Sequence, residues 1–223
     1  NKHHYEVEFV GHPLIDAIQN RTPTNDIEFR KENNLSDKPI IAILPGSRKQ
    51  EITKMLSVML SVAADFPDYQ FVIAGAPSQE YSFYSTFLIS NNCHFISNKT
   101  YDLLSVSCAA LVTSGTATLE TALFKVPEVV CYKGSWLSYQ IAKRIVTLKY
   151  ISLVNLIMDK EVVTELIQEK CNANSIKIEL QKLLDSKYRN KVLENYNALE
   201  LKLGGIGASQ KTAKLIVNNL QKI

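Results

Sequence analysis

Several features that assign a chain to a common protein class are missing from this sequence. None of its 4 cysteines belongs to a Cys-x-x-Cys pair, and no uninterrupted apolar run is long enough to cross a bilayer. Its 25 basic and 22 acidic residues are spread along the chain, so no polybasic stripe favours nucleic acid as a partner. There is also no signal peptide. These absences predict a cytoplasmic protein that has reduced cysteines and does not bind nucleic acid.

Common nucleotide-binding and metal-binding signatures are absent as well. Gly-x-Gly-x-x-Gly does not follow any expected strand, and the Gly-Lys-Ser/Thr of a P-loop does not occur. The chain has no Asp-x-Asp, so we predict no metal ion and no other cofactor. It starts at Asn1 without a methionine, and we interpret this start as the edge of a longer protein.

The order of the expected elements is typical of an α/β protein. Apolar residues make up 46% of the 223 residues, enough for a packed core. Strand and helix patterns alternate in the order 40–44, 49–66, 69–74, 78–89, 94–97, 101–106, 109–113, 116–124 and 128–132. After residue 160 we predict only helices, over 161–169, 176–184, 188–203 and 208–220. This order predicts a Rossmann-like parallel sheet with helices on both faces.

The most informative stretch runs from Ile40 to Glu51, where an apolar strand enters a turn of small residues and then a helix that begins with cations. Gly46 allows a ligand to approach the backbone, and the free amide groups of the helix's first turn favour an anion. Arg48 adds a planar fork that suits phosphate oxygens. A structural alternative remains open, because Ser47 and Gln50 have the spacing of a capping box.

A second turn of the same kind follows the strand expected over 109–113. Ser114, Gly115 and Thr116 leave room at the backbone, and their hydroxyl groups suit phosphate or sugar oxygens. Glu120 lies one helical turn later, where it either accepts two ribose hydroxyls or only interacts with the helix dipole. Because parallel strands present their carboxyl ends at one edge, we expect the two turns to form one site for a nucleotide diphosphate.

Three other segments remain ambiguous in the sequence alone. We expect a strand from Tyr5 to Val10, after which His12 either caps a short helix or faces a ligand cleft. The tail residues His3 and His4 lack a third metal ligand. Residues 136–145 are typical either of a helix at a membrane surface or of a core-facing helix.

The motifs, taken in order, resemble those of bacterial lipid-A-disaccharide synthases. They are Phe9 to Leu14, Leu44 to Arg48 with Glu51, Ser114 to Glu120, Ser152 to Ile157, and Glu165 to Gln168. The resemblance implies an inverting glycosyltransferase with two Rossmann-like halves, the GT-B architecture. This chain matches the carboxyl-terminal half, which binds the sugar donor.

The family reaction transfers 2,3-diacylglucosamine from UDP-2,3-diacylglucosamine to 2,3-diacylglucosamine 1-phosphate, which yields the β-1,6 lipid A disaccharide and UDP. By resemblance, Arg48 and Ser47 hold the diphosphate, Glu120 holds the ribose, and Asn155 and Gln168 lie near the donor. For Asn155 and Gln168 the residues alone favour a local structural role. The predicted binding residues are Gly46, Ser47, Arg48, Ser114, Gly115, Thr116, Glu120, Asn155 and Gln168.

The resemblance also predicts the organisation and the partners. Residues 1–186 form the nucleotide-sugar-binding domain, and the helices of 187–223 pack on the missing amino-terminal half or on another copy in a domain-swapped homodimer. The catalytic base is expected on that missing half, so the chain alone is expected to be inactive. The inner-membrane surface is a further expected contact. Two alternatives remain: another UDP-sugar enzyme, such as a 2-epimerase or the peptidoglycan glucosaminyltransferase, or a non-catalytic nucleotide-sugar-binding module.

Overall fold

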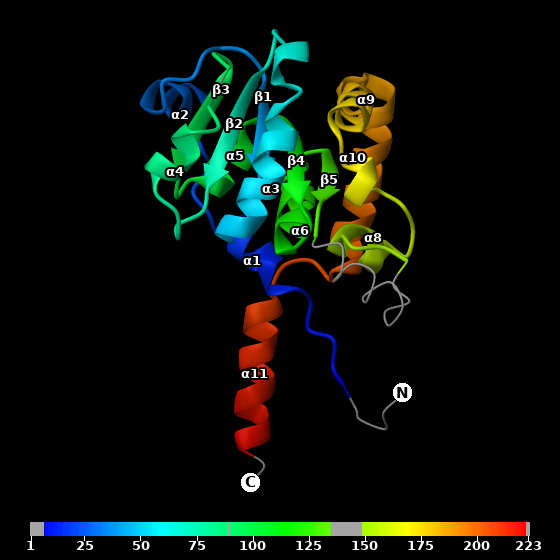
Figure 1. Ribbon diagram of the computed structural model, residues 1–223. Helices are drawn as coiled ribbons and strands as arrows, with labels where there is room; N and C mark the ends of the chain where they lie inside the picture. Colours follow the sequence, from blue (N-terminus) through cyan, green and yellow to red (C-terminus); the bar gives the residue numbers. More distant parts are fainter. Residues whose placement is uncertain (1–6, 89, 135–148, 222–223) are drawn as a thin grey trace.

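The computed structural model describes residues 7–88, 90–134 and 149–221. A six-stranded parallel sheet lies at its centre, with the strand order β3-β2-β1-β4-β5-β6 (Figure 1). The strands are β1 (Ile40–Leu44), β2 (Gln70–Gly75), β3 (Cys93–Ser97), β4 (Ser107–Thr113), β5 (Glu128–Tyr132) and β6 (Thr164–Ile167). The direction of the strand order changes between β1 and β4, so these two strands flank the switch point of a Rossmann-like sheet.

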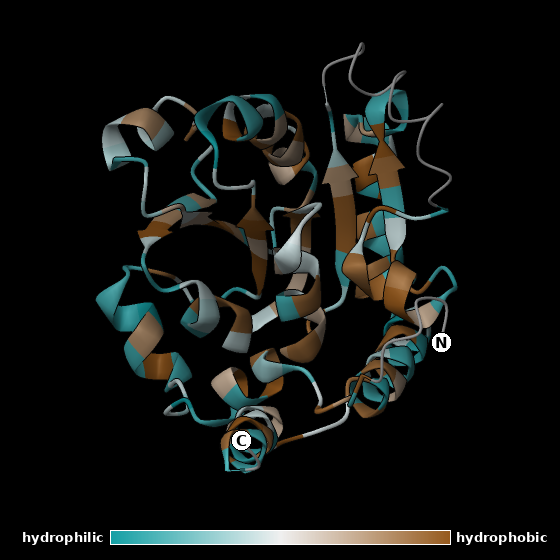
Figure 2. Ribbon diagram, turned by 90° about the horizontal axis from the view of Figure 1, so that it is seen from below, coloured by the Kyte–Doolittle hydropathy of each residue, from teal (hydrophilic) through white to brown (hydrophobic). Residues whose placement is uncertain are grey.

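The central strands are buried on both faces, which explains their continuous apolar sequences. In β1, Ile41 and Ile43 pack into one hydrophobic core, whereas Ile40, Ala42 and Leu44 pack into the other. Figure 2 shows the hydrophobic strands enclosed by helices whose outer sides are hydrophilic. The predicted α/β fold with a parallel sheet is confirmed.

Helices cover both faces of this sheet. They are α1 (Pro13–Gln19), α2 (Asp26–Glu32), α3 (Lys49–Leu60), α4 (Tyr81–Ser85), α5 (Thr100–Ser105), α6 (Thr116–Leu123), α8 (Leu153–Met158), α9 (Ala173–Leu184), α10 (Ser186–Lys202) and α11 (Ala208–Leu220), with short 3-10 helices η1 (Ala63–Asp65) and η2 (Gln168–Lys170). Helices α3, α9 and α10 contribute to one core, and α2 and α5 contribute to the other. Helix α3 ends six residues before the predicted end of 49–66, and η1 takes up half of the remainder.

Helix α1 begins as the sequence predicts. Pro13 is its first residue, and Nδ1 of His12 accepts a hydrogen bond from the amide of Leu14 at 3.2 Å. The capping interpretation of His12 is therefore confirmed. Helix α1 also anchors the start of α11, because the carboxylate of Asp16 accepts hydrogen bonds from the amides of Gly207 and Ser209 at 2.6 and 2.8 Å.

The last two helices differ in how they pack. Helix α10 buries Tyr196 and Leu199 in the same core as the sheet. Helix α11 projects away from the body beyond its contact with α1 (Figure 1), and Ile216 and Leu220 on it are exposed. The division at residue 186, and the packing of residues 187–223 on another half or another copy, stay predictions.

The helix predicted over 161–169 is wrong. The chain instead forms β6, which pairs with β5 so that Val130 lies opposite Glu165, and then the short helix η2. Three consecutive β-branched residues at positions 162–164 favour an extended backbone. The side chain of Asn155 also binds the backbone of Val162 and Val163, and this contact fixes the entry into the strand.

Two other expectations concern residues 3–10 and residues 136–145. The strand expected from Tyr5 to Val10 is wrong for residues 7–10, which have no regular secondary structure. The histidine tail at residues 3 and 4 and the helix expected over 136–145 lie outside the described residues.

Candidate functional site

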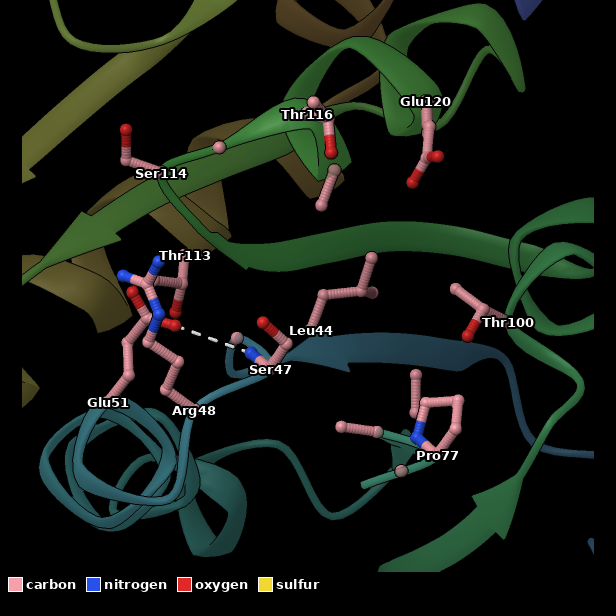
Figure 3. A pocket seen from close by; sticks show the side chains of 16 residues that line it. Leu44, Ser47, Arg48, Glu51, Pro77, Thr100, Thr113, Ser114, Thr116 and Glu120 are labelled. Carbon is pink, nitrogen blue, oxygen red and sulfur yellow. Dashed lines mark hydrogen bonds between the residues drawn. The ribbon is translucent and has the colours of Figure 1, made fainter. Parts of the chain in front are cut away.

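A cavity of about 360 Å³ lies at the carboxyl ends of β1 and β4. Because these two strands are hydrogen-bonded neighbours, the turns that follow them reach the same edge of the sheet. The cavity is lined by seven of the predicted binding residues: Gly46, Ser47, Arg48, Ser114, Gly115, Thr116 and Glu120 (Figure 3). The structure therefore brings both predicted turns together, and ligand binding by them stays a prediction.

Gly46 shapes the turn between β1 and α3. Its φ of +101° lies in the left-handed region, which residues with a Cβ atom rarely adopt. Helix α3 takes Arg48 as its N-cap residue, and no side chain caps it. The capping box of Ser47 and Gln50 is therefore not formed, because Ser47 precedes the N-cap position.

Glu51 lies over this turn, and its carboxylate forms a hydrogen bond with one of the turn's amide groups. Its Oε2 accepts a hydrogen bond from the amide of Ser47 at 3.3 Å (Figure 3). A Cβ atom added to Gly46 would lie 2.4 Å from the same oxygen. An anion that enters the cavity at this amide therefore competes with the Glu51 carboxylate.

Arg48 supplies the positive charge of the cavity wall. It is exposed, and in Figure 3 its side chain extends from the start of α3 toward the cavity. Among the described residues it forms no ion pair. Its guanidinium group is thus available to a negatively charged ligand.

The turn between β4 and α6 forms the opposite wall. The hydroxyl of Ser114 donates to the carbonyl of Ile151 at 2.9 Å, which ties this turn to the segment before α8. A Cβ atom added to Gly115 would meet no atom within 4 Å, so the backbone here is open to a ligand. Thr116 follows as the first residue of α6, whose free amide groups also face this edge of the sheet.

Glu120 lies one turn into α6 and points toward the cavity (Figure 3). Its Oε1 accepts a hydrogen bond from the hydroxyl of Tyr101 at 2.8 Å. Its Oε2 has no hydrogen-bond partner within the described ranges of the chain. One carboxylate oxygen is therefore held by the protein and the other is available.

Sequence reasoning missed several residues of the cavity wall, among them two threonines with hydroxyl groups. Thr113 ends β4, and its buried hydroxyl has no hydrogen-bond partner among the residues that the structure describes. The sequence does indicate this residue, because Thr113 is the last residue of the otherwise apolar strand expected over 109–113 and directly precedes the turn. Thr100 comes from the start of α5, and no local pattern links this helix to the two turns.

Asn155 and Gln168 are not among the residues that line this cavity. Asn155 is fully buried, and its side-chain oxygen accepts from the amides of Val162 and Val163 at 2.7 and 3.0 Å. Its side-chain nitrogen donates to the carbonyl of Val163 and to Glu165 at 2.8 and 2.9 Å. These four bonds fit the structural alternative, and a contact of Asn155 with the donor stays a prediction.

Gln168 lies directly after β6, at the same edge of the sheet as the cavity. Its backbone has a φ of 54°, and its buried Nε2 atom has no partner in the described part of the chain. The predicted contact of Gln168 with the donor is likewise untested.

The described residues contain neither a cluster of metal ligands nor a membrane-spanning helix. No group of three or more His, Cys, Asp or Glu side chains there is arranged to hold a metal ion. No helix there has both the length and the apolar character that crossing a bilayer requires.

Solved structures share this fold. The carboxyl-terminal domain of a group 1 family glycosyl transferase from Francisella tularensis superposes with a TM-score of 0.56 at 18% identity, covering 85% of this chain and 98% of that domain. An S. aureus protein solved with UDP has a TM-score of 0.62 at 14% identity, covering 96% of this chain and 55% of that protein. At these identities the likeness shows the fold alone, which is the Rossmann-like half of the GT-B fold predicted from the sequence.

Sequence comparison gives a more specific result. The family model for lipid-A-disaccharide synthetase matches residues 1–217. The lipid-A-disaccharide synthase of Syntrophus aciditrophicus is 36% identical over 225 residues, which cover 97% of this chain. The chain spans 58% of the length of that relative. This chain belongs to the lipid-A-disaccharide synthetase family.

Proposed function

We propose that this chain supplies the donor site of a lipid A glycosyltransferase and binds UDP-2,3-diacylglucosamine through its UDP group. The observation that carries the proposal is that Arg48 and Glu120 line the same cavity of about 360 Å³. The cation on one wall suits the diphosphate of a nucleotide, and the carboxylate on the opposite wall suits the hydroxyl groups of its ribose. The family match and the likeness to a protein solved with UDP support this choice of ligand.

The diphosphate is assigned to the turn after β1. The amide groups at the start of α3 carry partial positive charge, and Arg48 contributes a full charge without a competing ion pair among the described residues. Release of UDP during transfer increases the negative charge on the diphosphate. The guanidinium group of Arg48 and the helix terminus stabilise that charge, which lowers the barrier to transfer.

The ribose is assigned to Glu120. A carboxylate accepts hydrogen bonds at both oxygens, so it can receive two neighbouring ribose hydroxyls even while Tyr101 occupies one position on Oε1. Thr113 and Thr116 add hydroxyl groups along the cavity between the two ends. Each of these groups suits a sugar or phosphate oxygen.

The complete reaction is also a proposal, because the curated relatives are longer than this chain. We propose the inverting transfer of 2,3-diacylglucosamine to 2,3-diacylglucosamine 1-phosphate, with the base supplied by a part of the relatives that this chain does not match. The purified chain is then expected to bind UDP without making the disaccharide. Measurable disaccharide synthesis by the chain alone would refute this division of roles.

Titration calorimetry with UDP tests the donor site. We expect Arg48→Ala and Glu120→Ala each to weaken binding by about 10-fold or more, since hydrogen bonds to charged groups contribute about 1.5–3 kcal/mol. Lys49→Ala is the matched control, because Lys49 is the next cation in the chain but does not line the cavity. No binding of UDP by the wild type, or unchanged binding in both variants, would overturn the proposal.

A further inference from the structure

Tyr101 holds the carboxylate of Glu120 from outside the cavity. It lies on α5, it is not a lining residue, and its hydroxyl donates to Oε1 of Glu120 at 2.8 Å. Burial, together with the bond to Glu120, raises the pKa of Tyr101 to about 12. The hydroxyl therefore keeps its proton, and remains a donor, throughout the physiological pH range.

The ring of Tyr101 is itself fixed on two sides. It packs against the ring of Phe124, with 5.1 Å between the ring centroids. The guanidinium group of Arg21 lies over both rings, 5.6 Å from the centroid of Tyr101 and 5.4 Å from that of Phe124. These contacts restrict the ring, so its hydroxyl stays directed at Glu120.

Arg21 lies in the segment between α1 and α2, and its side chain is itself held by an ion pair. Its guanidinium nitrogen lies 2.5 Å from the carboxylate of Asp102, and that carboxylate also accepts a bond from the hydroxyl of Thr24 at 2.8 Å. Asp102 follows Tyr101 on α5. Four side chains from three parts of the chain thus fix the donor that reaches Glu120.

A free glutamate samples several rotamers, and a ligand that binds it must restrict them at an entropic cost. The bond from Tyr101 removes part of this freedom before a ligand arrives. It leaves Oε2 of Glu120 and one acceptor position on Oε1 for the cavity. A carboxylate held in this way is suited to receive two adjacent hydroxyls at once.

We propose that Tyr101 is a positioning residue that sets the preference of this site for ribose over 2′-deoxyribose by orienting Glu120. The inference rests on the proposed function, because it concerns the same nucleotide. Loss of the Tyr101 hydroxyl weakens the contact with the ribose diol and leaves the contacts with the diphosphate intact.

Titration of the 223-residue chain with UDP and with 2′-deoxy-UDP tests this role. We expect Tyr101→Phe to bind UDP about 3- to 10-fold more weakly, the effect of one hydrogen bond, and to bind 2′-deoxy-UDP almost as the wild type does. The ratio of the two affinities does not depend on the folded fraction, so a small loss of stability leaves it unchanged. Tyr196→Phe is the control, because the buried hydroxyl of Tyr196 has no described partner and lies outside the cavity.

The double variant separates an effect through Glu120 from any other effect. In a Glu120→Ala background, Tyr101→Phe is expected to cause no further loss of UDP affinity. An unchanged ratio of affinities in Tyr101→Phe, or the same loss with and without Glu120, would overturn the inference. If Glu120→Ala weakens UDP binding and Tyr101→Phe does not, only the inference fails. If the wild type does not bind UDP, the proposed function fails with it.

Discussion

The cavity beside β1 and β4 differs from the neighbouring region formed by β5, β6 and α8, which we call the β5–β6 region. In the cavity, Arg48 forms no ion pair among the described residues, and one oxygen of Glu120 is available. In the β5–β6 region, Asn155 and Glu165 are bonded to the protein, and Glu128 is buried without a partner in the described chain. Both regions contain motifs of the same family. From this difference we propose that the motif residues of the cavity bind ligand, whereas Asn155 and Glu165 maintain the fold.

The largest expected effect lies in the β5–β6 region. Asn155→Ala removes four hydrogen bonds, three of them to buried backbone groups of Val162 and Val163. We expect the free energy of unfolding in urea to fall by about 3–5 kcal/mol. Asn219→Ala, on the exposed side of α11, is the control. A small loss of stability together with a large loss of UDP affinity would show that Asn155 acts in ligand binding, as is proposed for the residues of the cavity.

A smaller effect is expected at the cavity, where Gly46→Ala would push the Glu51 carboxylate away from the amide of Ser47. Gly207→Ala is a matched control, because Gly207 has a φ of +100° but a Cβ atom there meets nothing within 4 Å. We expect Gly46→Ala to cost about 1 kcal/mol more than Gly207→Ala in urea unfolding, the value of the lost hydrogen bond. Equal costs would show that the Glu51 contact contributes nothing.

The smallest expected effect concerns the buried carboxyl group of Glu128. Burial, and then the charge of Glu165, raises the pKa of Glu128 well above its usual range. The folded protein therefore keeps this proton when the unfolded chain has lost it. Stability from this group is full below the unfolded pKa and decreases as the pH rises toward the folded pKa.

Glu128→Gln removes this dependence. We expect the variant to be more stable than the wild type at pH 8 and similar to it at pH 4, as measured by the midpoint of urea unfolding. A wild type that gains stability relative to Glu128→Gln as the pH rises would contradict the assignment of a protonated, buried Glu128.

The sequence predicted the cavity better than the β5–β6 region, and the reason is physical. Each cavity turn follows a strand and opens a helix, so Gly46 and Gly115 gave a local signal, and parallel pairing then brought the turns together. Strand β6 depends on pairing with β5, which is distant in sequence, and on side-chain hydrogen bonds from Asn155 that no local pattern of the sequence reveals. The hydrogen bond between Tyr101 and Glu120 likewise joins two helices whose packing no local pattern revealed.

The central claim is that one cavity holds both the ribose and the diphosphate of UDP. It is tested most directly with a ligand that has only one of these groups. Uridine has the ribose but no diphosphate, so its affinity and that of UDP can be compared by NMR titration in each variant. We expect Arg48→Ala to weaken UDP binding by about 10-fold or more and to leave uridine binding unchanged. We expect Glu120→Ala to weaken both ligands by a similar factor. An equal loss of uridine and UDP in Arg48→Ala, or unchanged uridine binding in Glu120→Ala, would contradict the account.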